Sequence, residues 1–277
     1  MFYRGFTQDE LQREYAPSST IGGDNSAYLA AYAALSDAAR AQLCPRENLS
    51  YGTAATQVLD FFDGPTPAAP LHVFIHGGYW QALSHRDGAS MAPGIVGRGS
   101  AFATLNYTLA PEARLAEMVA ECRDALLWLV RNAADLGFDP HRVTISGHSA
   151  GAHLAAMVLT QEAATLKAAG MTVTDAILIS GILDLEPLVH TMVNAPLQLT
   201  EAEIATLSPM TQLPTFGGHT RVTVGSLETG EFIRQSRSYA ERLRRAGHAV
   251  SFDLQHGLQH FDIILHDATF VPGSTAS

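Results

Sequence analysis

A serine between two glycines, in the segment Gly-His-Ser-Ala-Gly at residues 147–151, is the strongest constraint on how this chain folds. The residues before it have the pattern of a strand and the residues after it that of a helix, so Ser149 is predicted at a sharp turn. Such a turn exposes a weakly nucleophilic hydroxyl to a base and to a substrate carbonyl. Gly147 and Gly151 fit a crowded turn because they lack a Cβ atom. Ser149 is therefore a candidate nucleophile.

Short apolar runs typical of buried parallel strands alternate with helical patterns along the 277 residues, of which 47% are hydrophobic and 16% charged. This alternation predicts the α/β class, with a mostly parallel central sheet and helices on both faces, in a single domain over residues 1–277. The expected strands are residues 56–62, 71–76, 101–107, 142–146, 175–180, 221–225 and 250–255. The expected helices are residues 111–136, 150–167 and 231–246, with a last one starting at 261–266.

Two segments depart from this alternation. Residues 1–50 are predicted to form an N-terminal helical segment, with helices over 9–15 and 24–43 that pack over the core. Residues 181–218 contain several prolines and only short helical patterns, so we interpret them as a small insertion that caps the site.

Charge and composition exclude several classes of partner. The net charge of −10 and the pI near 5.6 argue against binding to nucleic acid or to an anionic membrane. We find neither a signal peptide nor an apolar run near the ~18 residues of a membrane helix, and two cysteines make no disulfide framework. We expect a cytoplasmic protein without a membrane partner. Metal-ligand and nucleotide-binding motifs are also absent from the sequence, so no metal and no cofactor are expected.

A second glycine-rich turn, His-Gly-Gly-Tyr-Trp at residues 76–80, follows the expected strand 71–76. Glycines let backbone N–H groups approach a developing negative charge, although an ordinary tight turn is the alternative interpretation. His76 precedes the serine in the chain and is interpreted as structural. The candidate oxyanion-hole donors are the N–H groups of Gly77, Gly78, Tyr79 and Ala150. The candidate substrate-pocket residues are Tyr79, Trp80 and His148.

A serine nucleophile needs a base, and in this arrangement the base is a histidine late in the chain. His260 lies where the loop after the last expected strand meets the following helix, which favours it over His248 and His266. His256, in the same loop, remains an alternative.

The acid that orients the histidine should follow a strand between the serine and the histidine. Glu228 lies in the loop after strand 221–225 and is the favoured candidate. Glu231 begins the next helix, where the helix dipole alone explains a carboxylate. Asp184 and Asp253 remain alternatives.

The motifs at 76–80 and 147–151 together resemble the kynurenine formamidase (arylformamidase) branch of the α/β-hydrolases. The resemblance implies an α/β-hydrolase fold, a triad of Ser149, His260 and Glu228, and hydrolysis of an N-formyl arylamine such as N-formylkynurenine. The family usually has Asp at the position of Glu228. Further similar segments are DELQREYAP at 9–17, LNYTLAPEA at 105–113, SGILDLEPLV at 180–189, LSPM at 207–210, GEFIRQS at 230–236 and HFDII at 260–264.

Bulky Tyr79 and Trp80 beside the oxyanion hole suit a small acyl group and an aromatic leaving group. A formyl group meets this requirement, and we expect a small-molecule acyl substrate with an aromatic group. Short-chain aryl or alkyl esters fit as well, so a carboxylesterase is the main alternative. A non-catalytic binding protein of the same fold is a second alternative, and pairing of two chains as a homodimer is left open.

Overall fold

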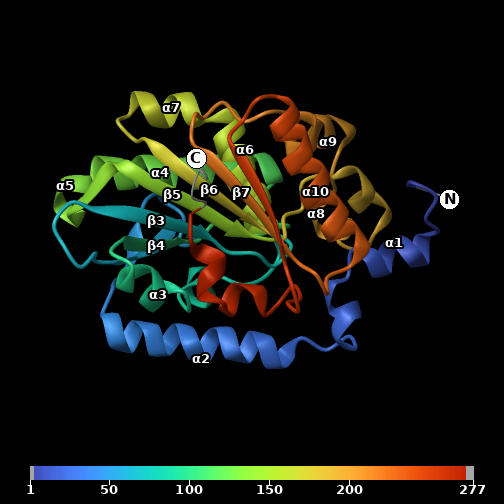
Figure 1. The fold of residues 1–277 in the computed structure, drawn as a ribbon, viewed down its shortest axis with the longest axis horizontal. Coiled ribbons are helices and arrows are strands. Elements are labelled where there is room, and N and C mark those ends of the chain that lie inside the picture. Colours follow the sequence, from blue (N-terminus) through green and yellow to red (C-terminus); the bar gives the residue numbers. More distant parts are fainter. Residues whose placement is uncertain (1–2, 273–277) are drawn as a thin grey trace.

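The computed structural model describes residues 3–272, so residues 1–2 and 273–277 of the predicted domain lie outside it. Eight strands form one sheet in the order β1-β2-β4-β3-β5-β6-β7-β8 (Figure 1). The pairs β1–β2 and β2–β4 are antiparallel and all other neighbours are parallel. The predicted α/β class with a mostly parallel sheet is confirmed. The strands are β1 (Arg46–Ser50), β2 (Val58–Phe62), β3 (Ala69–Ile75), β4 (Ala101–Leu105), β5 (Phe138–His148), β6 (Val173–Ile179), β7 (His219–Gly225) and β8 (Val250–Gln255).

Helices cover both faces of the sheet (Figure 1). Because successive side chains of a strand point to opposite faces, Phe74 packs on one side while Val73 and Ile75 pack on the other. The face of Phe74 is covered by α2 (Ser26–Leu43), α3 (Ala92–Gly97) and the 3₁₀ turns η5 (Ile263–Leu265) and η6 (Asp267–Phe270). The other face is covered by α4 (Leu115–Arg131), α5 (Ala133–Leu136), α6 (Ala150–Gln161), α7 (Ala163–Ala168) and α10 (Gly230–Arg245).

Several boundaries differ from the sequence expectation. Strand β1 was not expected, because its five residues are mostly exposed and carry no apolar alternation. The helix expected from residue 111 begins at Leu115, and the one expected over 150–167 is interrupted at Glu162. The expected last helix is replaced by the short turns η5 and η6. Within residues 3–272, no helix combines the length and hydropathy needed to cross a membrane.

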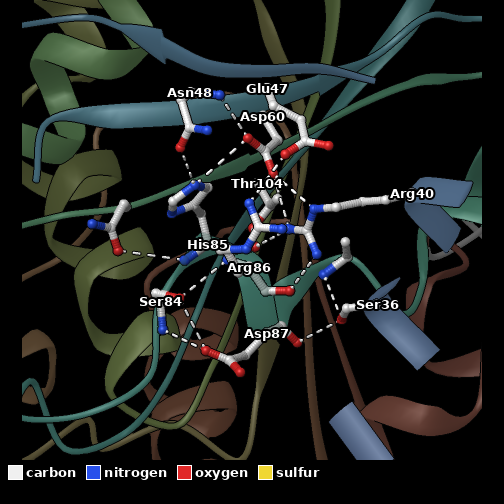
Figure 2. A network of polar contacts seen from close by, with 12 residues as sticks. Ser36, Arg40, Glu47, Asn48, Asp60, Ser84, His85, Arg86, Asp87 and Thr104 are labelled. Atoms are coloured by element: carbon white, nitrogen blue, oxygen red, sulfur yellow. Dashed lines mark hydrogen bonds and ion pairs between the residues drawn. The ribbon is translucent and has the colours of Figure 1, made fainter. Parts of the chain in front are cut away.

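Helix α2 lies along the sheet and is fixed to it by a buried ion pair (Figure 2). Arg40 donates from Nε and Nη2 to Oδ2 of Asp60 in β2, at 3.1 and 2.9 Å. The remaining Asp60 oxygen accepts the backbone N–H of Asn48 at 2.9 Å. Arg40 also donates to the carbonyl of Arg86, and Ser36 one turn earlier donates to the carbonyl of Asp87. These bonds attach the N-terminal segment to the body of the protein.

Helix α1 (Gln8–Glu14) is attached at a different place, against the start of α10. Tyr15, at the end of α1, donates a 2.8 Å hydrogen bond to Oε2 of Glu231, and Gln235 donates to the Tyr15 hydroxyl at 2.5 Å. Thr229 donates to the carbonyl of Glu14 at 2.6 Å. Between α1 and α2 lies the 3₁₀ turn η1 (Pro17–Ile21). The segment is thus bonded to the body at both ends.

The insertion over residues 181–218 contains only short elements. Gln8 of α1 donates to the carbonyl of His190, and Gln12 accepts the backbone N–H of Met192 at 2.8 Å. The insertion therefore lies beside α1. Its elements are η3 (Glu186–His190), α8 (Asn194–Leu197), α9 (Glu201–Leu207) and η4 (Pro209–Thr211).

Candidate active site

Ser149 occupies the junction between β5 and α6. Its backbone has φ 55° and ψ −116°, a conformation that residues other than glycine rarely adopt and that costs about 1–3 kcal/mol. The surroundings hold this conformation, because the Ser149 N–H donates to the carbonyl of Ile179 in β6 at 2.8 Å. The residue is only 3% exposed, yet it lines a cavity. The sharp turn expected from the sequence is therefore present, with the serine facing a bounded space.

Two close backbone approaches account for the glycines around Ser149. A Cβ atom on Gly151 would lie 2.0 Å from the carbonyl oxygen of Ile75 at the end of β3. A Cβ atom on Gly77 would lie 2.9 Å from the carbonyl oxygen of His148 and 3.2 Å from Cβ of Ser149. The glycine-rich turn after β3 and the turn of Ser149 are thus in direct contact, as the two halves of an oxyanion hole require.

The turn after β3 is conformationally unusual. Gly78, Tyr79 and Trp80 have φ values of 99°, 53° and 60°, so three successive residues are left-handed. Its end is held by a 2.8 Å hydrogen bond from Ala110 N–H to the carbonyl of Trp80. Gly78 and Tyr79 line the cavity beside Ser149. Ala150 is the first residue of α6, and the first N–H groups of a helix have no acceptor within it.

His260 and Glu228 form a buried pair. His260 Nδ1 donates to Oε2 of Glu228 at 2.7 Å, although the two residues come from the loops after β8 and β7. The other oxygen of Glu228 accepts the Ser180 hydroxyl at 2.6 Å and the Gly225 N–H at 2.8 Å. His260 also lines the cavity that contains Ser149. The glutamate side chain therefore reaches the histidine from this loop.

The alternative acids and base are engaged elsewhere or exposed. Asp184 accepts the Tyr3 hydroxyl at 2.7 Å, and Asp253 pairs with Arg221 at 2.6 Å. Glu231 pairs with Arg234 at 2.6 Å and accepts the hydroxyl of Tyr15. The alternative base, His256, is exposed. These positions do not converge on Ser149.

The cavity at Ser149 has a volume of about 360 Å³. Its wall is mainly apolar and aromatic, and almost half of it comes from the N-terminal segment, whereas the insertion 181–218 contributes only Val193 among the described residues. The lining residues are Gln12, Tyr15, Ala16, Pro17, Ser18, Asn25, Leu29, Tyr32, Gly78, Tyr79, Ala82, Leu83, His148, Ser149, Val193, His260 and Phe261.

Trp80, expected in the substrate pocket, does not line this cavity. Its side chain is fully buried, and its indole ring lies perpendicular to the His153 ring with centroids 5.0 Å apart. The rings of Tyr79 and Trp80 remain in edge contact, with centroids 6.2 Å apart, but only Tyr79 lines the cavity, whereas Trp80 is buried in the core. Trp80 therefore supports the turn rather than contacting a ligand.

His148 lies on the cavity wall, with the centroid of its ring 4.6 Å from that of His260. Burial and the neighbouring His260 hold the pKa of His148 well below its usual value, so the ring is neutral. Its Nε2 lies 2.9 Å from the carbonyl oxygen of His260, and a carbonyl can only accept. Nε2 therefore carries the proton and fixes the backbone of His260.

Three residues at the site were not singled out by the sequence. Ser180 supports Glu228, and Tyr15 and Tyr32 form part of the cavity wall. Tyr15 falls inside the similar segment at 9–17 and Ser180 begins the one at 180–189, whereas Tyr32 lies in neither. Among residues 3–272, no group of three or more His, Cys, Asp or Glu side chains could hold a metal ion.

The strand order, the strained serine turn and the Glu228–His260 pair define a hydrolase of the α/β-hydrolase class. The BD-FAE family model matches residues 60–207. The chain is 31% identical to kynurenine formamidase of Danio rerio over 95% of this chain and 92% of that protein. It is 34% identical to kynurenine formamidase of Drosophila melanogaster over 79% of this chain and 75% of that protein. The chain belongs to the kynurenine formamidase family.

A solved structure gives the same result for the fold. A protein from Silicibacter sp. tm1040, suggested to be a thioesterase, superposes with a TM-score of 0.81 at 29% identity. The match covers 92% of this chain and 93% of that one. The predicted α/β-hydrolase fold is therefore confirmed over nearly the whole chain.

Proposed function

We propose that this protein is an arylformamidase that hydrolyses N-formylkynurenine to kynurenine and formate. The observation that carries the proposal is the buried Glu228–His260 pair on the same cavity as Ser149, in a chain of the kynurenine formamidase family. The aromatic cavity wall favours an aryl leaving group. The turn after β3 approaches Ser149 so closely that a Cβ atom on Gly77 would lie 3.2 Å from Cβ of Ser149, which suits a small acyl group such as formyl.

Ser149 attacks the formyl carbon in the proposed mechanism. Nδ1 of His260 is bonded to Glu228, so Nε2 is the ring nitrogen that removes the hydroxyl proton. The carboxylate of Glu228 stabilises the resulting imidazolium. The carbonyl oxygen becomes an oxyanion, which accepts hydrogen bonds from backbone N–H groups of Gly77, Gly78, Tyr79 and Ala150.

The tetrahedral intermediate then breaks at its C–N bond. His260 returns the proton to the arylamine nitrogen, which leaves as a neutral amine, and Ser149 keeps the formyl group as an ester. Water, deprotonated by His260, attacks this ester and releases formate. The serine recovers its proton, so no redox partner or cofactor is required.

Two further features support proposals on the cellular location and the domain organisation of the protein. Cys44 is exposed and Cys122 is buried, and both are free thiols, which favours a reducing compartment. We therefore propose a cytoplasmic location. We also propose that the chain functions as one domain, because residues 12–32, the turn after β3 and the loop after β8 build a single cavity.

Substrate turnover tests the function. Purified enzyme should release kynurenine from N-formylkynurenine, and Ser149→Ala should abolish this activity while the protein stays folded. A fluorophosphonate probe should label Ser149 of the wild type, since a binding protein without a reactive serine would not be labelled. Rapid cleavage of p-nitrophenyl acetate together with no cleavage of N-formylkynurenine would make the protein an esterase instead.

A further inference from the structure

Almost half of the residues that line the cavity of Ser149 belong to the N-terminal segment. Tyr15, Pro17, Leu29 and Tyr32 contribute apolar surface from α1, η1 and α2. Because the formyl group of the proposed substrate is small, most of this cavity is left for the leaving group. The selectivity of the enzyme for its leaving group should therefore depend on residues 12–32.

Three tyrosines line the cavity, Tyr15 and Tyr32 from the N-terminal segment and Tyr79 from the turn after β3, and their hydroxyl groups are bonded to the protein. Tyr79 donates to the carbonyl of Tyr15 at 2.5 Å, Tyr15 donates to Glu231 at 2.8 Å, and Tyr32 donates to the carbonyl of Phe261 at 2.5 Å. Burial raises the pKa of all three hydroxyls, so they remain protonated donors. Their rings, fixed by these bonds, bound a space suited to a flat aryl group.

Three polar side chains of the same segment lie on the wall and retain hydrogen-bonding capacity. Asn25 makes no capping hydrogen bond at the start of α2. The carbonyl oxygen of the Gln12 side chain accepts the N–H of Met192, which leaves its NH₂ group as a donor. Ser18 supplies a hydroxyl, and all three residues are partly exposed to solvent. They can therefore bind a polar substituent on the aryl group.

The described lining contains no Lys, Arg, Asp or Glu side chain. A substituent with a single net charge would lose hydration there without gaining a counter-charge. A neutral or zwitterionic substituent avoids this cost and can still use the amide and hydroxyl groups.

We propose that residues 12–32 form a leaving-group subsite in which the tyrosine rings bind an aryl group and Gln12, Ser18 and Asn25 bind its uncharged or zwitterionic polar tail. This inference rests on the proposed arylformamidase function and specifies how that function selects its substrate. It assigns specificity to the N-terminal segment and not to the insertion.

The test compares two formamides that differ in the tail. N-formyl-L-kynurenine has a zwitterionic amino-acid tail, and formanilide has none. The double variant Ser18→Ala/Asn25→Ala should raise KM for N-formylkynurenine about tenfold, as expected for two lost hydrogen bonds, and leave kcat/KM for formanilide within about twofold. Ser26→Ala, an exposed neighbour of Asn25, is the matched control and should change neither value. Equal effects on both substrates, or none, would overturn the subsite.

A second measurement tests the preference for an uncharged or zwitterionic tail. The desamino analogue of N-formylkynurenine keeps only the carboxylate, and the wild type should bind it with a higher KM than N-formylkynurenine. A lower KM for this anion would refute the preference for a neutral or zwitterionic tail.

Failure of the proposed function gives a different result. If the wild type hydrolyses neither formamide but cleaves phenyl acetate, the arylformamidase assignment fails and the subsite is assessed with esters. O-acetyl-L-tyrosine then takes the place of N-formylkynurenine, and phenyl acetate the place of formanilide. The double variant should again be impaired only on the substrate that carries the amino-acid tail. An equal loss of activity on both esters, or no loss on either, would reject the subsite.

Discussion

Ser180 donates a 2.6 Å hydrogen bond to Oε1 of Glu228, the carboxylate whose other oxygen receives His260. Ser180 follows β6 directly and has a left-handed backbone with φ 50°. Its N–H is bonded to the carbonyl of Thr223 in β7. The carboxylate of Glu228, the proposed acid, is thus held by groups from two neighbouring strands, Ser180 after β6 and the Gly225 N–H in β7.

Two substitutions of Glu228 should distinguish the effect of its charge from the effect of its side-chain length. Glu228→Gln removes the charge that stabilises the imidazolium and should lower kcat by about 10⁴, by comparison with the serine protease triad. Glu228→Asp keeps the charge but shortens a side chain whose two oxygens are both bonded, so a smaller loss of about tenfold is expected. Steady-state kinetics with circular dichroism as a folding control measures both. A near wild-type rate for the Gln variant would assign the role to another carboxylate.

Removing the hydrogen bond from Ser180 to Glu228 should lower kcat modestly and leave KM unchanged. Ser180→Ala deletes one hydrogen bond to Glu228, and we expect kcat to fall about three- to tenfold. KM should remain unchanged, because Ser180 does not line the cavity. A variant with altered KM and normal kcat would argue against positioning of the acid.

The contact between Gly151 and β3 predicts a severe effect of one added methyl group. Gly151→Ala would place Cβ 2.0 Å from the carbonyl oxygen of Ile75, so the turn of Ser149 must shift. We expect loss of activity and a marked fall in the melting temperature. Gly97→Ala in α3 meets nothing within 4 Å and is the control, expected to be neutral or slightly stabilising. Full activity of the Gly151 variant would contradict the observed geometry.

The ion pair that anchors α2 should behave as a buried pair (Figure 2). Arg40→Met leaves the fully buried Asp60 carboxylate without its cation, and we expect the free energy of unfolding to fall by about 3–5 kcal/mol. The double variant Arg40→Met/Asp60→Asn removes both charges and should recover part of this loss. Urea denaturation measures the difference, and equal stability of the two variants would mean that the charges are not coupled.

Buried histidines predict a dependence of stability on pH. Burial lowers the pKa of His72 to about 3 and that of His153 to about 4, whereas the unfolded chain binds these protons near pH 6.5. The native state therefore binds fewer protons, and the free energy of unfolding should decrease as pH falls from about 6.5 to about 4. Each such histidine contributes up to about 1.4 kcal/mol per pH unit.

Urea denaturation at several pH values between 4.5 and 7.5, approximate limits set by these pKa values, measures the slope. His153→Gln keeps a donor for the carbonyl of Leu207, to which His153 is bonded at 2.7 Å, and should reduce the slope. An unchanged slope in this variant would show that His153 is not neutral in the native state.

The sheet and the reactive turn were predictable because they depend on local pattern. The central strands, such as those predicted at 71–76 and 101–107, were short apolar runs, and burial on both faces of a parallel sheet produces such runs. The positions of Ser149, Glu228 and His260 followed from the order of strands and loops. In contrast, β1 is exposed and polar, and its pairing with β2 leaves no periodic signal.

Contacts between distant segments explain what the sequence missed. The sequence placed Trp80 in the pocket by proximity to Tyr79, but adjacent residues of a left-handed turn need not face the same side. The hydrogen bond from Ser180 to Glu228 depends on the pairing of β6 with β7, which the sequence does not specify. The part played by residues 12–32 in the cavity depends on bonds to residues more than 200 positions away, which periodicity cannot report.

The bond from Tyr32 to the carbonyl of Phe261 joins residues 229 positions apart, and that from Tyr15 to Glu231 spans 216. During synthesis the first helices leave the ribosome long before their partners exist. Helix α2 can bond to Asp60 and Asp87 early, but its contact with Phe261 forms only when almost the entire chain has been made. The cavity is consequently among the last features to form, and catalytic activity would report completed folding more faithfully than secondary structure does.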